Sequence, residues 1–203
     1  MILLISSTTA LADPPKTMMN TIYAQAMIGS SVMAEVTNTP STVSDQESEA
    51  STAITGAIGY RWKYFGLELL AASLGETTVN HSDFYTETHK ATFIGGGLHW
   101  AWWFFDLKFG WGNLTDKTKF EKGDKSASFS ANPNNKSTGQ TAGYFGIGLN
   151  FDLGENTELV IDYTAYAYTK KKPQVLVLDG VTHESSDPEY GIGTINLGLR
   201  WFL

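Results

Sequence analysis

The segment NLGLRWFL, residues 196–203, alternates between two kinds of side chain up to the last residue of the sequence. One side of the alternation is apolar and the other is mixed: Leu197, Leu199, Trp201 and Leu203 stand against Asn196, Gly198, Arg200 and Phe202. A repeat of two residues is the period of a β-strand, in which successive side chains point to opposite faces. The segment therefore predicts a strand with one apolar face. Chain ends in water usually fray. A regular strand whose apolar face reaches the last residue therefore predicts that something other than water covers this face.

The spacing within this segment resembles the C-terminal insertion signal of bacterial outer-membrane β-barrels. The matching positions are the polar Asn196, then Gly198, then the apolar Trp201 and Leu203 three and five places after the glycine. That family most often ends in Phe, so Leu203 departs from its pattern while keeping an apolar terminus. The resemblance implies that residues 196–203 form the last strand of a closed membrane barrel, which the barrel assembly machinery would recognise.

Length and composition exclude several classes of protein. The 203 residues fit one β-domain or at most two small ones. No run of eighteen apolar residues occurs, so a spanning helix is excluded. The mean hydropathy of −0.16 would suit a soluble protein, but alternating strands hide a lipid-facing side from such averages. The net charge of −7 argues against a nucleic-acid partner, and the absence of cysteine excludes disulfides and thiolate metal sites.

The N-terminal residues predict an export signal. Residues 1–12 are apolar and rich in small side chains, and they end in the cleavage pattern Ala10-Leu11-Ala12. No Lys or Arg precedes the apolar part, so we expect the true translation start to lie upstream. The alternative is a buried first strand or helix. We expect a signal peptide at 1–12, a short leader at 13–20 and the barrel domain at 21–203.

The remaining sequence predicts about eight strands joined by loops that alternate between long and short. Alternating segments are expected at 21–37, 53–62, 65–69, 92–102, 105–112, 143–152, 159–166 and 196–203. The long polar connections are 38–51, 76–90, 113–140 and 170–191. Short turns on one side and long loops on the other are typical of an up-and-down membrane barrel. The predicted fold is therefore all-β: a closed antiparallel up-and-down eight-stranded transmembrane β-barrel.

The distribution of charge over the two strand faces separates this barrel from a soluble one. A soluble eight-stranded carrier, such as a lipocalin or an avidin, places apolar side chains inside and charges outside. Here one face of each strand is bulky and uncharged, whereas the other collects Gly, Ala, Thr and nearly every strand charge. Aromatic residues also cluster where strands meet short turns, and we expect them to form a periplasmic girdle at the headgroup level rather than a soluble core. The girdle residues are Trp62, Tyr64, Trp100, Trp102, Trp103, Phe104 and Trp201.

The charges on the inner face nearly balance. The cations are Arg61, Lys108 and Arg200, and the anions are Glu68, Asp106, Asp152 and Asp162. Side chains just fill an eight-stranded barrel, and an unpaired buried ion costs several kcal/mol. We therefore expect an ion-pair network that packs the interior, in which Glu68 pairs with Arg61 or Arg200. The alternative is a constriction through which small solutes pass.

Sequence motifs for catalysis and metal binding are weak in this chain. His99 is expected to point inward as a network member, and His81, His89 and His183 lie in expected loops at no metal-ligand spacing. The tetrapeptide His183-Glu184-Ser185-Ser186 faintly resembles the His-x-Ser motif of outer-membrane lipid A deacylases, but Ser186 replaces the Asn of that family. A triad needs a base oriented by a third group, which this tetrapeptide does not supply. We expect no catalytic residue, cofactor or metal.

The hairpin that joins Gly59-Tyr60-Arg61-Trp62 to Leu67-Glu68-Leu69 resembles the second hairpin of small outer-membrane barrels of the OmpA, OmpX and opacity-protein kind. This resemblance, which covers about residues 21–203, implies a non-enzymatic protein of the bacterial outer membrane. We expect it to serve membrane integrity or to contact a surface ligand or host factor through four outer loops. The alternatives are a narrow solute channel and a lipid A-modifying enzyme. Expected partners are membrane lipid, lipopolysaccharide and the assembly machinery, around a monomeric barrel.

Overall fold

The computed structural model describes residues 20–35, 46–81, 85–102, 104–122, 127–129, 138–169, 174–178, 181–185 and 189–203. All regular structure within these ranges is β-strand, and no helix there is long and apolar enough to cross a membrane. The expected signal peptide at 1–12 and the leader at 13–20, apart from Asn20, lie outside the described residues.

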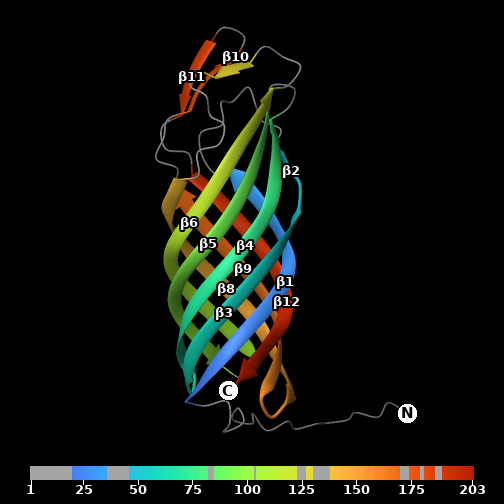
Figure 1. The fold of residues 1–203 in the computed structure, drawn as a ribbon, viewed down its shortest axis with the longest axis vertical. Helices are drawn as coiled ribbons and strands as arrows, with labels where there is room; N and C mark the ends of the chain where they lie inside the picture. Colours follow the sequence, from blue (N-terminus) through green and yellow to red (C-terminus); the bar gives the residue numbers. More distant parts are fainter. Residues whose placement is uncertain are drawn as a thin grey trace, which may run out of the picture.

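Eight long antiparallel strands close into a barrel (Figure 1). They are β1 (Thr21–Glu35), β3 (Ser51–Trp62), β4 (Phe65–His81), β5 (Tyr85–Trp102), β6 (Phe105–Lys122), β8 (Thr138–Gly154), β9 (Thr157–Thr169) and β12 (Glu189–Phe202). Each strand pairs with the next one along the chain, and β12 returns to pair with β1, with Tyr23 opposite Phe202. The closed eight-stranded up-and-down barrel expected from the sequence is confirmed.

Four short strands lie at the end of the barrel where the connections are long. Strand β2 (Gln46–Ser48) pairs with β4. Strands β10 (Gln174–Leu178) and β11 (Val181–Ser185) form a hairpin, and β10 also pairs with β7 (Ala127–Phe129) to complete a three-stranded sheet. This small sheet lies above the barrel mouth, away from the C-terminus (Figure 1). Segments from two different connections thus meet over this end of the barrel.

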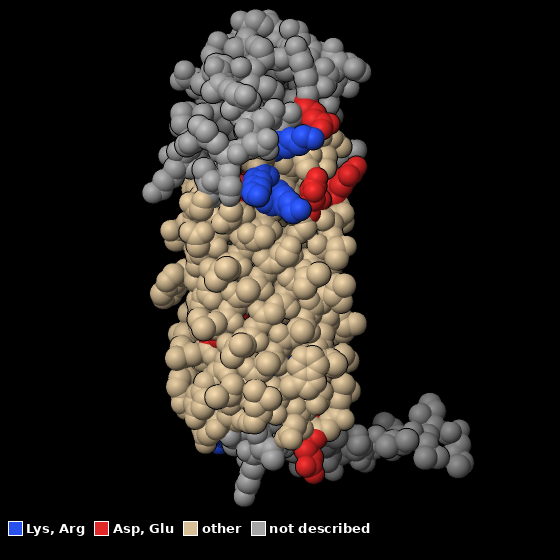
Figure 2. Space-filling model, viewed as in Figure 1, with Lys and Arg blue, Asp and Glu red and all other residues tan. Residues whose placement is uncertain are grey.

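The alternation of each strand places large apolar side chains outside and polar ones inside. The exposed large apolar residues form an apolar belt around the barrel. They lie within 22–32 of β1, 54–62 of β3, 65–69 of β4, 94–102 of β5, 109–111 of β6, 145–153 of β8, 161–163 of β9 and 195–201 of β12, with Leu203 just after β12. On the face that Figure 2 shows, the outer wall carries almost no charge over most of its height. In water this surface would be unstable, because exposed apolar patches of this size mark a contact with another apolar phase.

Several strands continue well beyond the ends that the alternation predicts. The expected loop at 76–90 is mostly strand, because β4 runs to His81 and β5 begins at Tyr85. The expected loop at 113–140 likewise contains the end of β6 and the start of β8, and the expected loop at 170–191 contains the start of β12. The reason is that the apolar outer face ends at the edge of the belt, whereas the hydrogen-bonded ladder between neighbouring strands continues past it.

A β-bulge interrupts the pairing of β4 with β5 above the belt. The register shifts between Ser73 and Glu76, and Gly75 lies in the left-handed region with a φ of 74°. A Cβ atom at Gly75 would lie 2.4 Å from the carbonyl oxygen of Thr52. Glycine fits this position because it lacks a Cβ and adopts positive φ without strain.

Candidate functional site

A cluster of polar and charged side chains fills the barrel interior near the short turns. We call it the lower network, and each member is at most 4% exposed: Tyr23, Gln25, Arg61, Glu68, His99, Asp106, Lys108, Glu158, Asp162 and Arg200. Isolated charges with so little exposure would be strongly destabilising, so their pairing decides whether the barrel is stable.

Glu158 connects the two arginines of the lower network. Its Oε1 accepts a hydrogen bond from Arg61 Nη1 at 3.0 Å, and its Oε2 accepts one from Arg200 Nη1 at 2.8 Å. The Phe202 ring lies under the Arg61 guanidinium, 5.6 Å from its Cζ. One carboxylate on β9 therefore pairs with cations from both β3 and β12 and links the two sides of the barrel.

Arg200 extends the network to β1 and β6. Its Nε donates to Gln25 Oε1 at 2.8 Å and its Nη2 donates to Asp106 Oδ2 at 2.7 Å. On the other side of Asp106, its Oδ1 lies 2.5 Å from His99 Nε2. Three of the five guanidinium N–H groups thus have carboxylate or amide partners, which fixes the orientation of this side chain.

A second ion pair lies further from the short turns. Lys108 Nζ on β6 is 2.9 Å from Asp162 Oδ2 on β9. Asp162 also accepts hydrogen bonds through Oδ1 from the Thr164 hydroxyl at 2.7 Å and from Asn196 Nδ2 at 3.4 Å. These partners offset the desolvation of both charges.

Five of the seven residues expected in the interior ion network lie in the ion pairs described above: Arg61, Asp106, Lys108, Asp162 and Arg200. Glu68 is also buried, but the expected pair with Arg61 or Arg200 is wrong. Its Oε2 instead accepts a hydrogen bond from the Tyr23 hydroxyl at 2.8 Å, and among the described residues it pairs with neither arginine.

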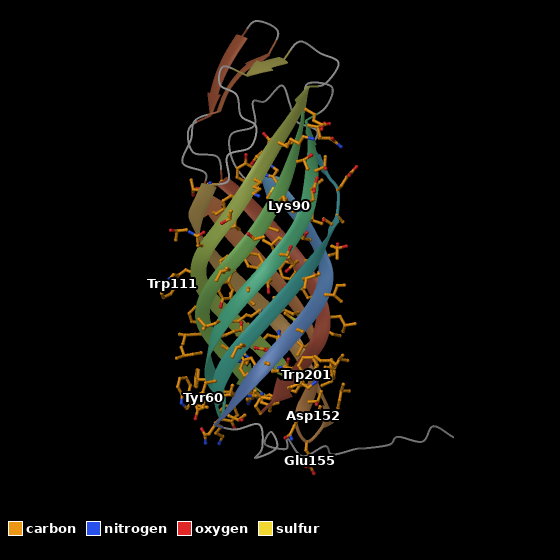
Figure 3. All side chains as sticks on the ribbon, in the orientation of Figure 1. Tyr60, Lys90, Trp111, Asp152, Glu155 and Trp201 are labelled. Atoms are coloured by element: carbon orange, nitrogen blue, oxygen red, sulfur yellow. The ribbon has the colours of Figure 1, made fainter. Side chains whose placement is uncertain are left out.

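The expected place of Asp152 in the interior ion network is wrong, because its side chain is exposed. Asp152 is exposed at the β8–β9 turn, near Glu155 (Figure 3). Its register partner on β9 is Glu158, and like charges that face each other across strands repel. Glu158 occupies the interior beside the arginines, and Asp152 stays in solvent. The alternation in the sequence predicts that the seventh strand begins at Leu159, which leaves Glu158 out, whereas β9 begins at Thr157. Glu158 has the same parity as the inward Val160 and Asp162, and this signal places it inside.

An apolar septum crosses the barrel between the lower network and the far mouth. It is one cluster of buried side chains: Met33, Ala57, Leu70, Ala72, Leu74, Ala91, Phe93, Leu114, Ala142, Tyr144, Tyr166, Tyr168, Tyr190 and Ile192. At its centre the Phe93 ring lies 5.0 Å from the Tyr166 ring and 5.5 Å from the Tyr144 ring, measured between centroids. Large aromatic rings in mutual contact fill the width of the barrel, as expected for eight strands.

A second polar cluster, the upper cluster, adjoins the far side of the septum and shares Tyr168 with it: Glu87, His89, Asp116, Thr118 and Tyr168. His89 Nε2 is 2.9 Å from Glu87 Oε2, and His89 Nδ1 is 2.9 Å from Asp116 Oδ2. Asp116 Oδ2 also accepts hydrogen bonds from the Thr118 and Tyr168 hydroxyls at 3.1 Å. The sequence predicts a loop at His89, whereas the structure buries it on β5 between two carboxylates.

The upper cluster predicts a pH-dependent stability. His89 lies on the part of β5 beyond the apolar belt; burial disfavours its charged form, but hydrogen bonds with Asp116 and Glu87 outweigh this and raise its pKa from 6.5 to about 9. Among the described residues, the Tyr190 ring lies 5.2 Å from the His89 ring, and the Tyr168 hydroxyl donates to Asp116 beside it. A raised histidine pKa stabilises the folded state fully below pH 6.5, and the contribution is lost as pH rises through about 9.

We therefore expect the wild-type free energy of unfolding to fall by about 3 kcal/mol relative to that of the His89→Gln variant between pH 6 and pH 10. Urea unfolding of both proteins at several pH values measures this difference. A difference that stays constant across this range would show that His89 is not held as a cation.

The expected girdle residues lie on the outer wall at the short-turn end. Trp62, Trp100, Trp102, Phe104 and Trp201 are exposed and Tyr64 is partly exposed, whereas Trp103 lies outside the described residues. Figure 3 shows Tyr60 and Trp201 near this end of the barrel. In the C-terminal segment, Asn196 is buried in the interior, Trp201 and Leu203 face outward, and Gly198 is opposite Met27 of β1.

The weak catalytic motif lies in the small surface sheet. His183 and Ser185 are on β11, where they pair with Leu176 and Gln174 of β10, and Ser186 lies outside the described residues. Within the described ranges, no group of three or more His, Asp or Glu side chains is arranged to hold a metal ion.

Comparison with known proteins gives one family and several similar structures. A family model described as the outer membrane protein beta-barrel domain matches residues 3–201. No curated protein sequence matches the chain. Neisserial surface protein A matches with a TM-score of 0.51 and 13% identity, covering 90% of this chain and 97% of that one.

Two further structures resemble the chain more weakly. Ail, the attachment invasion locus protein of Yersinia pestis, crystallised with the heparin analogue sucrose octasulfate, gives a TM-score of 0.48 at 16% identity, covering 89% of this chain and 99% of Ail. The outer membrane protein OprG of Pseudomonas aeruginosa gives 0.46 at 10% identity, covering 91% and 97%. At these identities the resemblance concerns the fold alone.

Proposed function

The chain belongs to the outer-membrane protein β-barrel family and lies in the bacterial outer membrane, and from this premise we propose that it is a non-enzymatic surface protein with a closed interior. It contributes to membrane integrity or to contact with a surface ligand or host factor through its loop end. The single observation that carries the proposal is the apolar septum, which lies between two buried polar clusters.

The order of side chains along β5 and β6 supports a closed interior. Going away from the short turns, the inward residues of β6 pass from charged to apolar and back to charged: Asp106 and Lys108, then Leu114, then Asp116. Strand β5 repeats this order with His99, Phe93 and His89. A hydrated path for ions would have to cross the apolar layer, where the surrounding side chains offer little to replace the ions' hydration.

The outer wall supports an orientation in the membrane. We place the short turns in the periplasm, with the exposed aromatic residues of that end as the girdle at the inner headgroup layer. Asn196, Gly198, Trp201 and Leu203 then serve as the insertion signal read by the barrel assembly machinery. The outer leaflet, including lipopolysaccharide, surrounds the opposite end of the belt. A barrel that closes its own sheet has no unpaired strand edge, which supports a monomer.

The loop end supports a role in surface contacts. There the strands extend beyond the belt, and β7, β10 and β11 add a separate sheet above the mouth (Figure 1). Loops carried on a rigid barrel are the usual place for recognition, because the scaffold fixes their positions.

Ion conductance tests the closed interior. We expect the refolded protein to give no unitary current steps in a planar bilayer, because the septum excludes water and ions. A mobility shift between boiled and unboiled samples on a gel verifies that the barrel is folded, and a general porin measured in the same bilayer verifies the sensitivity. Steady current steps of one size from independent folded preparations would overturn the proposal in favour of a narrow solute channel.

A further inference from the structure

Two lysines stand side by side on the outer wall just beyond the apolar belt. Lys90 of β5 and Lys117 of β6 are direct register partners, and both are exposed. Their side chains therefore project from the same face of the sheet on neighbouring strands. Like charges directly opposite each other in an antiparallel pair are destabilising. This juxtaposition needs a compensating anion.

The described part of the protein does not supply this anion by direct pairing. Neither Lys90 nor Lys117 has a carboxylate oxygen within 4.0 Å among the described residues. Glu76 of β4 is the register partner of Lys90 on the other side, yet it makes no such contact. By contrast, Lys119 is paired with Glu121 at 3.1 Å. The two lysines thus remain available to a ligand.

The position of this pair matches the headgroup layer of the outer leaflet. On β5 the belt ends at Ile94, so Lys90 lies about 13 Å further along the strand and about 10 Å higher along the membrane normal. Figure 2 shows Lys or Arg side chains at the upper edge of the uncharged wall, and Figure 3 places Lys90 there. A lysine at this height keeps its ammonium among the headgroups while its aliphatic stem covers apolar surface.

The wall between the lysines and the belt suits a phosphorylated lipid. The next outward pair toward the belt is Thr92 opposite Thr115, and the Thr92 hydroxyl can donate to a phosphate oxygen. Further along the same two strands, Gly96 lies opposite Trp111. Gly96 and Trp111 help line an apolar hollow of about 830 Å³ in the outer wall, which can accept hydrocarbon but not a free anion.

We propose that Lys90 and Lys117 form a binding site for the phosphate group of an outer-leaflet lipid, with the acyl chains against the adjoining apolar wall. The two ammonium groups neutralise one phosphate in a charge-assisted contact, which relieves their mutual repulsion. The site fixes a lipid to the β5–β6 face and sets the depth of the barrel. It depends on the location of the barrel in the outer membrane and not on the loops or on a closed interior.

The test measures binding of dimyristoyl phosphatidic acid to the refolded protein in a non-ionic detergent, by native mass spectrometry. A chelator is present, because a divalent cation could link the lipid to Glu76 instead. We expect Lys90→Gln/Lys117→Gln to weaken binding about 30-fold, since each lysine near an anionic lipid surface contributes about fivefold. The matched control is Lys63→Gln, which removes the same charge from an exposed turn at the opposite end and is expected to leave binding unchanged.

Two further binding measurements distinguish recognition of a phosphorylated lipid from recognition of acyl chains alone or of free phosphate. Dimyristoylglycerol, which has the acyl chains but no phosphate, should bind wild-type and double-variant protein equally weakly. Inorganic phosphate should not displace the lipid at equal concentration. The proposal is overturned if the double variant binds phosphatidic acid as the wild type does, if Lys63→Gln weakens binding equally, or if inorganic phosphate competes on equal terms. A gel mobility shift verifies folding of each variant.

Discussion

Replacing Glu158 by Gln is expected to lower the free energy of unfolding by about 3–5 kcal/mol, the range for removing one partner of a buried ion pair. The amide keeps the shape of the side chain but carries no charge, so Arg61 and Arg200 lose the carboxylate that they share at 3.0 and 2.8 Å. Arg200 keeps Asp106, whereas the described structure gives Arg61 no second carboxylate. Urea unfolding of the folded barrel, followed by tryptophan fluorescence, measures the change.

The matched control for this variant is Asp152→Asn, which removes the same charge from the residue opposite Glu158 on β8. Asp152 is exposed, so we expect a change within about 0.5 kcal/mol. Equal losses of unfolding free energy in the two variants would mean that the net charge at this turn, and not the contacts of Glu158 with the arginines, determines the stability. No loss in either would remove Glu158 as the centre of the lower network.

Replacing Phe93 by Ala is expected to destabilise the barrel by about 3–5 kcal/mol, because it leaves a cavity at the centre of the septum. Phe93 is completely buried and contacts the rings of Tyr144 and Tyr166. Its ring also covers Gly95 and Gly112, where an added Cβ would lie 2.5 and 2.7 Å from Phe93 Cζ. Gly95 and Gly112 have no side chains that could move into the space left by the ring, so the cavity is not easily filled.

Phe109→Ala is the control for the septum variant, because Phe109 lies on β6 in the apolar belt and is 50% exposed. Lipid chains can occupy the space that this ring leaves, so we expect a loss of about 2 kcal/mol or less. Both variants are compared by urea unfolding in the same lipid. A Phe93 variant no less stable than the Phe109 variant would contradict a tightly packed septum.

Strand parity is the part of this structure that the sequence predicts well. In residues 196–203, the expected inner side chains Asn196, Arg200 and Phe202 are buried, and Trp201 and Leu203 are exposed. Parity follows from the covalent geometry of an extended chain, in which neighbouring side chains point in opposite directions. A barrel in lipid makes the pattern easy to read, because its two faces meet such different surroundings.

Strand ends are predicted less well, for a physical reason. Beyond the belt the outer face meets polar surroundings, as at Lys90 and Lys117, so the alternation disappears even though β5 and β6 remain paired. A stretch of sequence that is polar at every position predicts a loop. The same stretch can form a strand when hydrogen bonds to neighbouring strands hold it in place. This is why His89 was expected in a loop and is found buried between Glu87 and Asp116.

The sequence by itself determined the class of barrel, the direction in which the side chains of the belt point, and the interior position of six charged residues: Arg61, Glu68, Asp106, Lys108, Asp162 and Arg200. These properties depend on the two-residue period of a single strand. Only the tertiary structure decided the partners: Glu158, and not Glu68 or Asp152, joins Arg61 to Arg200. Pairing across the barrel depends on the register between strands far apart in the chain, and a one-residue change of register moves each side chain to the other face.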